Sequence, residues 1–476
     1  MVTAIGQKAI EMSRTNPWWR GGQWAATDVD LRQARDRSLG YQSDCLDDLT
    51  PGGLYLLRGP RRVGKTVVVK QTIERLLAEG APPTSIVRVA ADGWSAKDLR
   101  TVVQNTALPP VHGGAARWWF LDEVTAVTGE WARQIKWLRD NDPEFAVATV
   151  VLTGSSAGQL TAASGVLAGR RGPITRADRT LLPMGFRTFS RLLDPVLPDA
   201  ERLPLSGLRG RNAAASYQGL LPWLDTLIRL WERYLAYGGF PVSVSAARDG
   251  QPVPPHFVND IFDVVFKDAF AGSRLSTTTT SALVERVMSS MASPLNMSNI
   301  AADLDLAAES VRRHVNYLRD GYLVWHCPQK EGKSWTPREL AQDKVYAIDP
   351  LVARLAHLRS PERADVDPTV LTEMLLGMAI HRAAYAAGTA WADDQFLFHA
   401  RTPARKEIDF VAQPLAGVAL ECKYSDTGRW AGEAATVNSS QWAGILATRS
   451  VLDTSAGTDS DAWAVPAAFL AYLLDS

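Results

Sequence analysis

Eight consecutive residues in the first third of the chain have the spacing of a phosphate-binding loop. They are Gly59, Pro60, Arg61, Arg62, Val63, Gly64, Lys65 and Thr66, which match the pattern G-x-x-x-x-G-K-[ST]. The glycines allow backbone N–H groups to curl around phosphate oxygens at the start of a helix. The pattern predicts that Lys65 contacts the β- and γ-phosphates of ATP, as a binding and catalytic residue, and that Thr66 ligates Mg²⁺.

Two acidic residues end an apolar segment further along the chain. Trp118–Leu121 is followed directly by Asp122 and Glu123, as in a Walker B strand. We expect Asp122 to hold Mg²⁺ and Glu123 to polarise the attacking water. A second apolar run, Val150–Thr153, also ends in small polar residues, and its position predicts that Ser155 senses the γ-phosphate.

The segment Ala168–Gly172 contains two adjacent arginines, Arg170 and Arg171. Two interpretations stay open. Arg170 is either an arginine finger that stabilises charge in the transition state, which would favour an oligomer, or a solvated loop residue.

A predicted hairpin near the C-terminus brings two carboxylates together. Glu407–Ala412 and Val418–Lys423 are strand-like and flank the five-residue turn Gln413–Gly417. This turn length places Asp409 opposite Glu421. Because side chains alternate along a strand, the polar residues of both strands share one face.

Directly opposed carboxylates repel each other, so the pair Asp409 and Glu421 calls for a cation. Mg²⁺ suits such a pair, and Lys423 would then stabilise charge on an attacking hydroxide or on phosphate. The hypothesis is a metal site made by Asp409 and Glu421 with Lys423 as a catalytic neighbour. The alternative is a solvated sheet face with a Glu407–Lys423 ion pair.

The ATP-site motifs lie on elements that alternate between strands and helices. The expected strands are Leu54–Arg58, Ile86–Ala90, Trp118–Leu121 and Ala148–Thr153. Alternation of this kind predicts βαβ units and a parallel sheet. It places the glycine-rich loop and the acidic pair after strands, where α/β proteins bind ligands.

The pattern changes near residue 291. Two expected helices, Ser298–Asp303 and Ala307–Asp320, precede the expected strands Tyr322–His326 and Lys344–Ile348, which indicates a winged helix-turn-helix. The second helix carries Arg312, Arg313, His314 and Arg319. This helix either enters the major groove of DNA or belongs to a protein–protein module or a spacer between domains.

Bulk composition narrows the class of protein. Hydrophobic residues make up 46% of the 476 residues, and 51 basic residues balance 51 acidic ones. This hydrophobic content is typical of a soluble globular protein. The equal numbers of basic and acidic residues mean that the chain as a whole has no excess of positive charge that would indicate nucleic-acid binding. Cys45, Cys327 and Cys422 are widely spaced, which fits a reducing cytoplasm. We expect no membrane span, because no long apolar run occurs.

Taken in order, the motifs resemble those of a bacterial and archaeal family of AAA-type ATP-binding proteins. Members carry a C-terminal domain of unknown function that resembles PD-(D/E)xK restriction-endonuclease-like nucleases. Beyond the segments already described, the resemblance rests on Asn16–Trp19, Leu182–Phe189, Gly238–Pro241, Lys267–Asp268 and Lys344–Asp349.

The resemblance and the patterns together predict an α/β protein. It has an N-terminal leader (1–50), a P-loop AAA-type ATPase domain (51–200), a linker and helical lid (201–290), a winged helix (291–349) and a restriction-endonuclease-like α/β domain (350–476). One departure concerns His381, which stands where family members have a Glu, so the third carboxylate is missing unless Glu373 substitutes. Histidine can still bind a metal, which makes His381 a further candidate to lie beside the Asp409–Glu421 metal site. Cleavage by this domain is therefore left open.

The predicted function is an ATP-hydrolysing switch or motor that acts on DNA, with ATP and Mg²⁺ as cofactors. One alternative is an ATP-dependent nuclease in DNA repair or genome defence. Another is a regulatory nucleotide switch or a protein-remodelling ATPase, whose nuclease domain is inactive and used for binding. The alternatives differ in whether DNA or a protein is the partner.

Overall fold

The computed structural model describes residues 4–37, 39–105, 108, 111, 116–269, 276–389, 396–424, 430–455 and 462–475. The chain divides into two units, Met1–Leu182 (unit 1) and Pro183–Ser476 (unit 2). No helix within the described residues is both long and apolar enough to cross a membrane.

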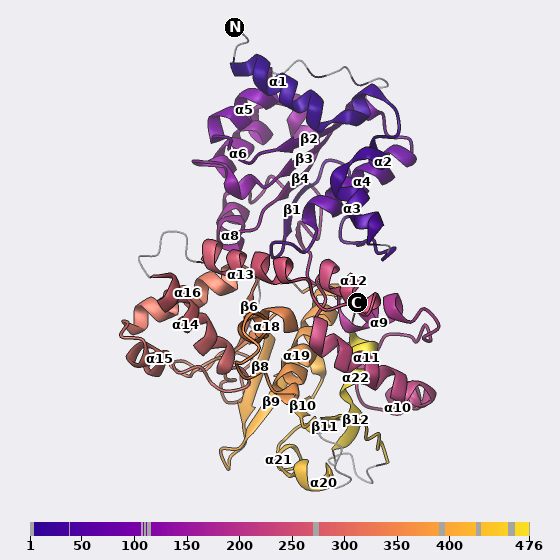
Figure 1. Ribbon diagram of the computed structural model, residues 1–476, viewed down its shortest axis with the longest axis vertical. Helices are drawn as coiled ribbons and strands as arrows, with labels where there is room; N and C mark the ends of the chain where they lie inside the picture. Colours follow the sequence, from indigo (N-terminus) through magenta and orange to yellow (C-terminus); the bar gives the residue numbers. More distant parts are fainter. Residues whose placement is uncertain are drawn as a thin grey trace. The chain divides into compact units, whose positions relative to one another are not determined.

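Unit 1 is built on a parallel five-stranded sheet with the strand order β2-β3-β4-β1-β5. Its elements are α1 (Ala4–Thr15), α2 (Trp24–Thr27), α3 (Val29–Asp36), β1 (Leu54–Arg58), α4 (Lys65–Ala78), β2 (Ile86–Ala90), α5 (Ala96–Asn105), β3 (Trp118–Asp122), α6 (Trp131–Asn141), α7 (Pro143–Val147), β4 (Thr149–Thr153), α8 (Ala157–Val166) and β5 (Asp178–Thr180). Helices α5 and α6 cover one face, and α3 and α4 cover the other (Figure 1). The four expected strands are confirmed, whereas the short edge strand β5 was not predicted.

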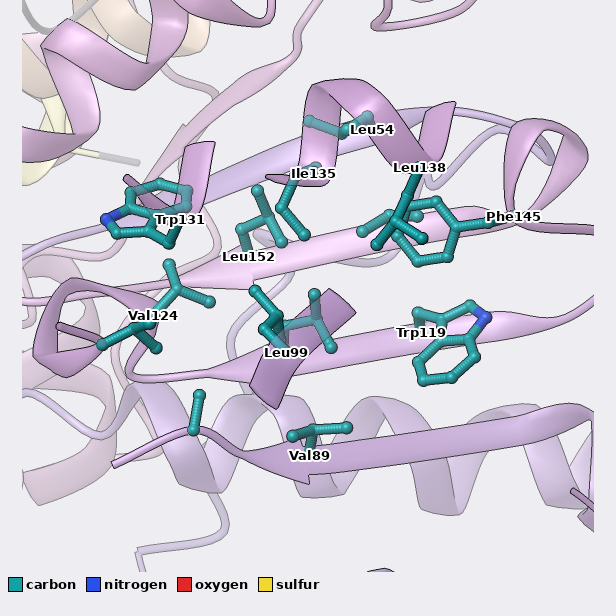
Figure 2. Packing of buried hydrophobic residues seen from close by; sticks show 14 of the residues in the cluster. Leu54, Val89, Leu99, Trp119, Val124, Trp131, Ile135, Leu138, Phe145 and Leu152 are labelled. Atoms are coloured by element: carbon teal, nitrogen blue, oxygen red, sulfur yellow. The ribbon is translucent and has the colours of Figure 1, made fainter. Parts of the chain in front are cut away.

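The core of unit 1 lies between the sheet and the helices on one face. Figure 2 shows Leu54, Trp119 and Leu152 from three strands packing toward Ile135 and Leu138 of α6. All five are buried, and burial of a side chain of this size contributes about 1.5–3 kcal/mol. This packing fixes the strand ends that carry the polar residues of the site.

The N-terminal leader covers the exposed edge of strand β2. The side chain of Asn16 accepts a hydrogen bond from the Arg88 N–H at 2.6 Å and donates to the Arg88 carbonyl at 2.8 Å. The indoles of Trp18 and Trp19 both donate to the Ile86 carbonyl. Side chains of the leader therefore satisfy backbone groups that an edge strand leaves unpaired.

Unit 2 begins with helices and ends with a second sheet. The helices are α9 (Phe186–Leu193), α10 (Arg211–Gly219), α11 (Leu224–Tyr237), α12 (Pro241–Arg248), α13 (Pro255–Ala269), α14 (Thr277–Ser289), α15 (Met297–Asp303), α16 (Ala308–Asp320), α17 (Pro350–Ala353), α18 (Leu355–Arg359), α19 (Pro368–Ala386), α20 (Trp430–Glu433), α21 (Ala435–Asn438) and α22 (Ala467–Leu474). Helix α10 lies within residues 201–290, the expected linker and helical lid.

Strands β6 (Val324–Cys327) and β7 (Lys344–Ala347) form an antiparallel pair after α15 and α16. The buried side of α16 carries Val311, His314, Val315 and Leu318. Beyond β6, Gln329 forms a parallel bridge with His399. The β6–β7 pair is thereby joined to the second sheet of the same unit.

The second sheet has the order β12-β11-β10-β9-β8. Its strands are β8 (Leu397–Arg401), β9 (Glu407–Ala412), β10 (Val418–Cys422), β11 (Ala443–Thr448) and β12 (Trp463–Pro466). Strands β8, β9 and β10 are antiparallel neighbours, whereas β10, β11 and β12 are parallel. Helix α19 packs against β10 and α22.

Two glycine motifs of unit 2 are places of close backbone approach. The Gly239 N–H donates to Asp349 Oδ2 at 2.7 Å, and a Cβ on Gly239 would lie 2.0 Å from the Met184 carbonyl oxygen. A Cβ on Gly238 would meet the Asp349 carboxylate at the same separation. The segments Gly238–Pro241 and Lys344–Asp349 thus meet in the fold and have a structural role there.

Gly239→Ala is expected to destabilise unit 2 by about 1–3 kcal/mol or more, because the added methyl overlaps backbone that cannot rotate away. Urea denaturation of the full chain measures the loss. The matched control is Gly219→Ala, since a Cβ there meets no atom within 4 Å. Equal midpoints for the two variants would contradict the packing role of Gly239.

Candidate functional site

The glycine-rich loop connects β1 to α4, as the sequence predicts. Gly59 and Gly64 have φ angles of +141° and +104°, which glycine adopts without strain. A Cβ on Gly59 would lie 2.1 Å from the Leu181 carbonyl oxygen. The buried Lys65 begins α4, and its Nζ donates to the carbonyls of Gly59 and Pro60 at 2.9 Å each. The Lys65 ammonium therefore lies inside the loop, in the space where the backbone N–H groups of the loop would bind phosphate.

Asp122 and Glu123, the two acids of the site, lie at the carboxyl end of strand β3. Asp122 ends β3, and its Oδ1 accepts a hydrogen bond from the Thr153 hydroxyl at 2.6 Å. Glu123 has a left-handed φ of +55°, and its carboxylate accepts from the Ser155 hydroxyl at 2.9 and 3.1 Å. Strand β4 lies between β1 and β3, so its end supplies the two hydroxyls that orient the acids.

Sequence reasoning missed Arg88, which lies on β2. Its Nη2 is 2.6 Å from Asp122 Oδ2, and both side chains are nearly buried. The signal was present as one charged residue in the otherwise apolar run Ile86–Ala90. Arg88 neutralises Asp122 in this state, so a metal ion at Asp122 has to share that carboxylate with the guanidinium.

In unit 2, the hairpin β9–β10 has the predicted register. Val411 pairs with Ala419 and Phe410 pairs with Leu420, so Asp409 falls opposite Glu421. Both residues are buried, with 7% and 4% of their surface exposed. The alternative of a solvated sheet face is therefore wrong.

Lys344 of β7 supplies the first cation that meets these acids. Its Nζ lies 2.9 Å from Glu373, 2.6 Å from Glu407 and 3.1 Å from Asp409, and its side chain is fully buried. Lys423 instead pairs with Glu421 at 2.9 Å. The expected Glu407–Lys423 ion pair is replaced by Glu407–Lys344. We call Glu373, Glu407, Asp409 and Glu421 the carboxylate cluster.

Burial dominates the electrostatics of this cluster. Burial, followed by repulsion from Asp409, raises the pKa of Glu373 and that of Glu421. Within the described part of the chain, no three His, Cys, Asp or Glu side chains converge as a ready-made metal site. The cluster has the oxygen donors that Mg²⁺ prefers, but Lys344 stands among three of them.

His381 does not join the carboxylate cluster through any described contact. Its ring packs edge-on against Trp325 and Phe396, with centroids 4.8 and 4.9 Å away. Burial lowers its pKa to about 3, so it is neutral and part of an aromatic core. The expectation of His381 beside the metal is wrong, and Glu373, two helical turns earlier on α19, is the helical acid near Asp409.

Comparisons with known proteins agree with the geometry of unit 1. Residues 52–190 match a family model described as "AAA domain". The chain contains an AAA-type P-loop ATPase domain, most of which belongs to unit 1. Residues 228–362 match a second model, described as "Domain of unknown function (DUF8612)". No curated protein matches the chain.

Several solved structures are distantly similar. A Walker-type ATPase of Pyrococcus abyssi is 14% identical, with a TM-score of 0.36, over 69% of this chain and 95% of its own. The Aeropyrum pernix ORC2 protein is 12% identical, with a TM-score of 0.31, over 70% and 94%. The Thermotoga maritima RuvB branch migration motor is 14% identical, with a TM-score of 0.28, over 63% and 92%. Similarity at these TM-scores carries no information about the function of this chain.

Arg170 lies near the amino ends of the parallel strands, whereas the glycine-rich loop lies at their carboxyl ends. The neighbouring Arg171 carbonyl accepts from the N–H of Leu54, the first residue of β1, whereas the loop follows the last residue of β1. Arg170 itself pairs with Asp140 at 3.0 Å. Within one chain Arg170 is therefore directed away from the phosphate site, and an arginine finger requires a second subunit.

Proposed function

We propose that the AAA domain binds ATP with Mg²⁺ and hydrolyses it. The observation that carries this proposal is the placement of Lys65, Asp122 and Glu123 at the carboxyl ends of β1 and β3, with the hydroxyls of β4 between them. Ligands of parallel α/β sheets bind at this edge. Phosphate would replace the loop carbonyls as the partner of Lys65.

Each side chain then has a defined task. Thr66 and Asp122 offer a hydroxyl and a carboxylate, which are hard oxygen donors suited to Mg²⁺. The metal would neutralise charge on the phosphates. Glu123 accepts a proton from the attacking water, and the Ser155 hydroxyl holds the Glu123 carboxylate in place near the γ-phosphate. Hydrolysis of ATP by the purified chain, measured as phosphate release, tests this proposal.

We infer that unit 2 binds DNA through a winged helix. The support is the order α14, α15, α16, β6, β7, together with the exposed arginines Arg312, Arg313 and Arg319 on α16. The opposite side of α16 is apolar and buried. Phosphate contacts by arginine supply most of the sequence-independent affinity for DNA.

The partner is tested by measuring the ATPase rate with duplex DNA, with RNA and with no addition. DNA stimulation that is lost in an Arg312→Glu, Arg313→Glu variant supports an ATP-driven switch or motor on DNA. Stimulation by neither nucleic acid contradicts it and favours the protein-remodelling alternative.

We also propose a divalent-metal position at Asp409 and Glu421, with Lys423 beside it, in a restriction-endonuclease-like fold. The mixed sheet, the opposed carboxylates and the helical acid Glu373 support this assignment. Glu421 Oε2 is buried and has no hydrogen-bond partner among the described residues. Cleavage of DNA with Mg²⁺, with and without ATP, distinguishes an active nuclease from a binding scaffold.

If Arg170 or Arg171 acts across a subunit interface, mixing two inactive proteins should partly restore ATPase activity. The pair is an Arg170→Ala, Arg171→Ala variant and Lys65→Ala, since a mixed interface contains one intact loop and one intact arginine. Phosphate release from the mixture is the measurement. Absence of rescue, with full hydrolysis by a diluted monomer, would contradict a shared site.

A further inference from the structure

The buried ammonium of Lys344 lies among three of the four acids of the carboxylate cluster. Its side chain is 0% exposed, and it contacts Glu373, Glu407 and Asp409 within 3.1 Å. These partners come from helix α19 and strand β9, whereas Lys344 comes from β7. A lysine this deeply buried requires such partners, because an isolated buried charge is strongly unfavourable.

The contacts of Asp409 show what the lysine excludes. Asp409 Oδ1 accepts from Lys344 at 3.1 Å, and Oδ2 accepts from the Cys422 N–H at 2.8 Å. Both oxygens that could bind a metal are thus in use. A divalent ion at Asp409 would also lie close to the positive Lys344 ammonium, and like charges at such distances repel strongly in a buried site.

The charges of the cluster leave room for a cation nevertheless. Four carboxylates face two ammonium groups, those of Lys344 and Lys423. When all are ionised, negative charge is in excess. Glu421 lies on β10, opposite Asp409 on β9, and its Oε2 atom is buried without a hydrogen-bond partner among the described residues. This is a second, independent indication that a proton or a cation belongs there.

We propose that the Lys344 ammonium competes with a divalent cation for the carboxylate cluster, so that strand β7 is a built-in inhibitor of metal binding. This inference rests on the proposed metal position at Asp409 and Glu421. The Lys344 side chain is fully buried, and its backbone is held by pairing with Cys327 and by a bridge to Pro294, so strand β7 keeps the ammonium at the cluster. Access of metal to Asp409 is therefore coupled to the position of β7.

Lys344→Met tests the competition in the full chain, with Mn²⁺ alone as the probe and no nucleotide present. Calorimetry and the Mn²⁺-induced shift in melting temperature are measured. We expect Mn²⁺ affinity to rise by roughly tenfold or more relative to the unmodified chain, because one repelling positive charge is removed. Adding Asp409→Asn to Lys344→Met should abolish the gain, which assigns it to this cluster.

Lys330→Met is the matched control. Lys330 is also buried, and it lies over the Trp335 ring and donates to Gly332 rather than to a carboxylate. Its Mn²⁺ affinity should equal that of the unmodified chain. If Lys344→Met does not fold without metal, a Lys344→Met, Glu407→Gln variant keeps the original net charge and should still bind Mn²⁺ more tightly.

Each outcome has one meaning. Equal Mn²⁺ affinity in the unmodified chain and in Lys344→Met, or weaker affinity in Lys344→Met, overturns the competition while leaving the metal position intact. No Mn²⁺ binding by any of these proteins overturns the metal position and the inference together. Neither result bears on ATP hydrolysis by the AAA domain.

Discussion

Replacing Lys65 by alanine is expected to abolish nucleotide binding. The Lys65 ammonium donates to two carbonyls of the glycine-rich loop, those of Gly59 and Pro60. Hydrogen bonds to charged groups contribute about 1.5–3 kcal/mol each, so we expect ATP affinity to fall by roughly 100-fold or more. Calorimetric titration with ATP and Mg²⁺ measures the change.

Lys97→Ala serves as the control. Lys97 is exposed on α5, and its replacement removes the same charge from the same domain. It should bind ATP as the unmodified chain does. Normal ATP affinity in Lys65→Ala would show that nucleotide binds elsewhere. Equal losses in both variants would point to an effect of net charge rather than of the loop.

Glu123→Gln is expected to bind ATP normally and to hydrolyse it about 10²–10⁴-fold more slowly, the range that general-base catalysis supplies. The amide keeps the shape of the side chain, and its oxygen can still accept from the Ser155 hydroxyl. It cannot accept the proton of the attacking water. The measurement is phosphate release together with ATP binding on the same preparation.

Glu130→Gln is the matched change. Glu130 also follows β3 in the chain, but it is exposed and pairs only with Arg133 among the described contacts. Its turnover should be normal. Unchanged turnover in Glu123→Gln would mean that another residue positions the water. Loss of ATP binding in Glu123→Gln would indicate a structural role for its left-handed backbone.

The sequence predicted the parts of the fold whose cause is local. The apolar runs predicted β1 to β4, because strands buried on both faces are made of consecutive apolar residues. The glycines predicted the loop, because positive φ angles favour glycine. The β9–β10 register followed from the length of one turn. A one-residue slip there would move Asp409 and Glu421 to opposite faces.

The parts that could not be predicted depend on contacts between distant segments. Lys344 is 29 residues from Glu373 and 65 from Asp409, and nothing local shows that they meet. The same holds for Arg88 and Asp122, 34 residues apart. His381 was misplaced because its role was inferred from the family resemblance, whereas in the structure its ring packs against Trp325.

The most direct test of ATP hydrolysis is steady-state phosphate release from ATP by the purified full-length chain with Mg²⁺. We predict measurable turnover in the unmodified chain, none in Lys65→Ala, and at least about 100-fold less in Glu123→Gln. ATP binding should persist only in the second variant. Turnover that is absent from the unmodified chain, or equal in all three proteins, would contradict the assignment of Lys65 and Glu123 to an ATP-hydrolysing site.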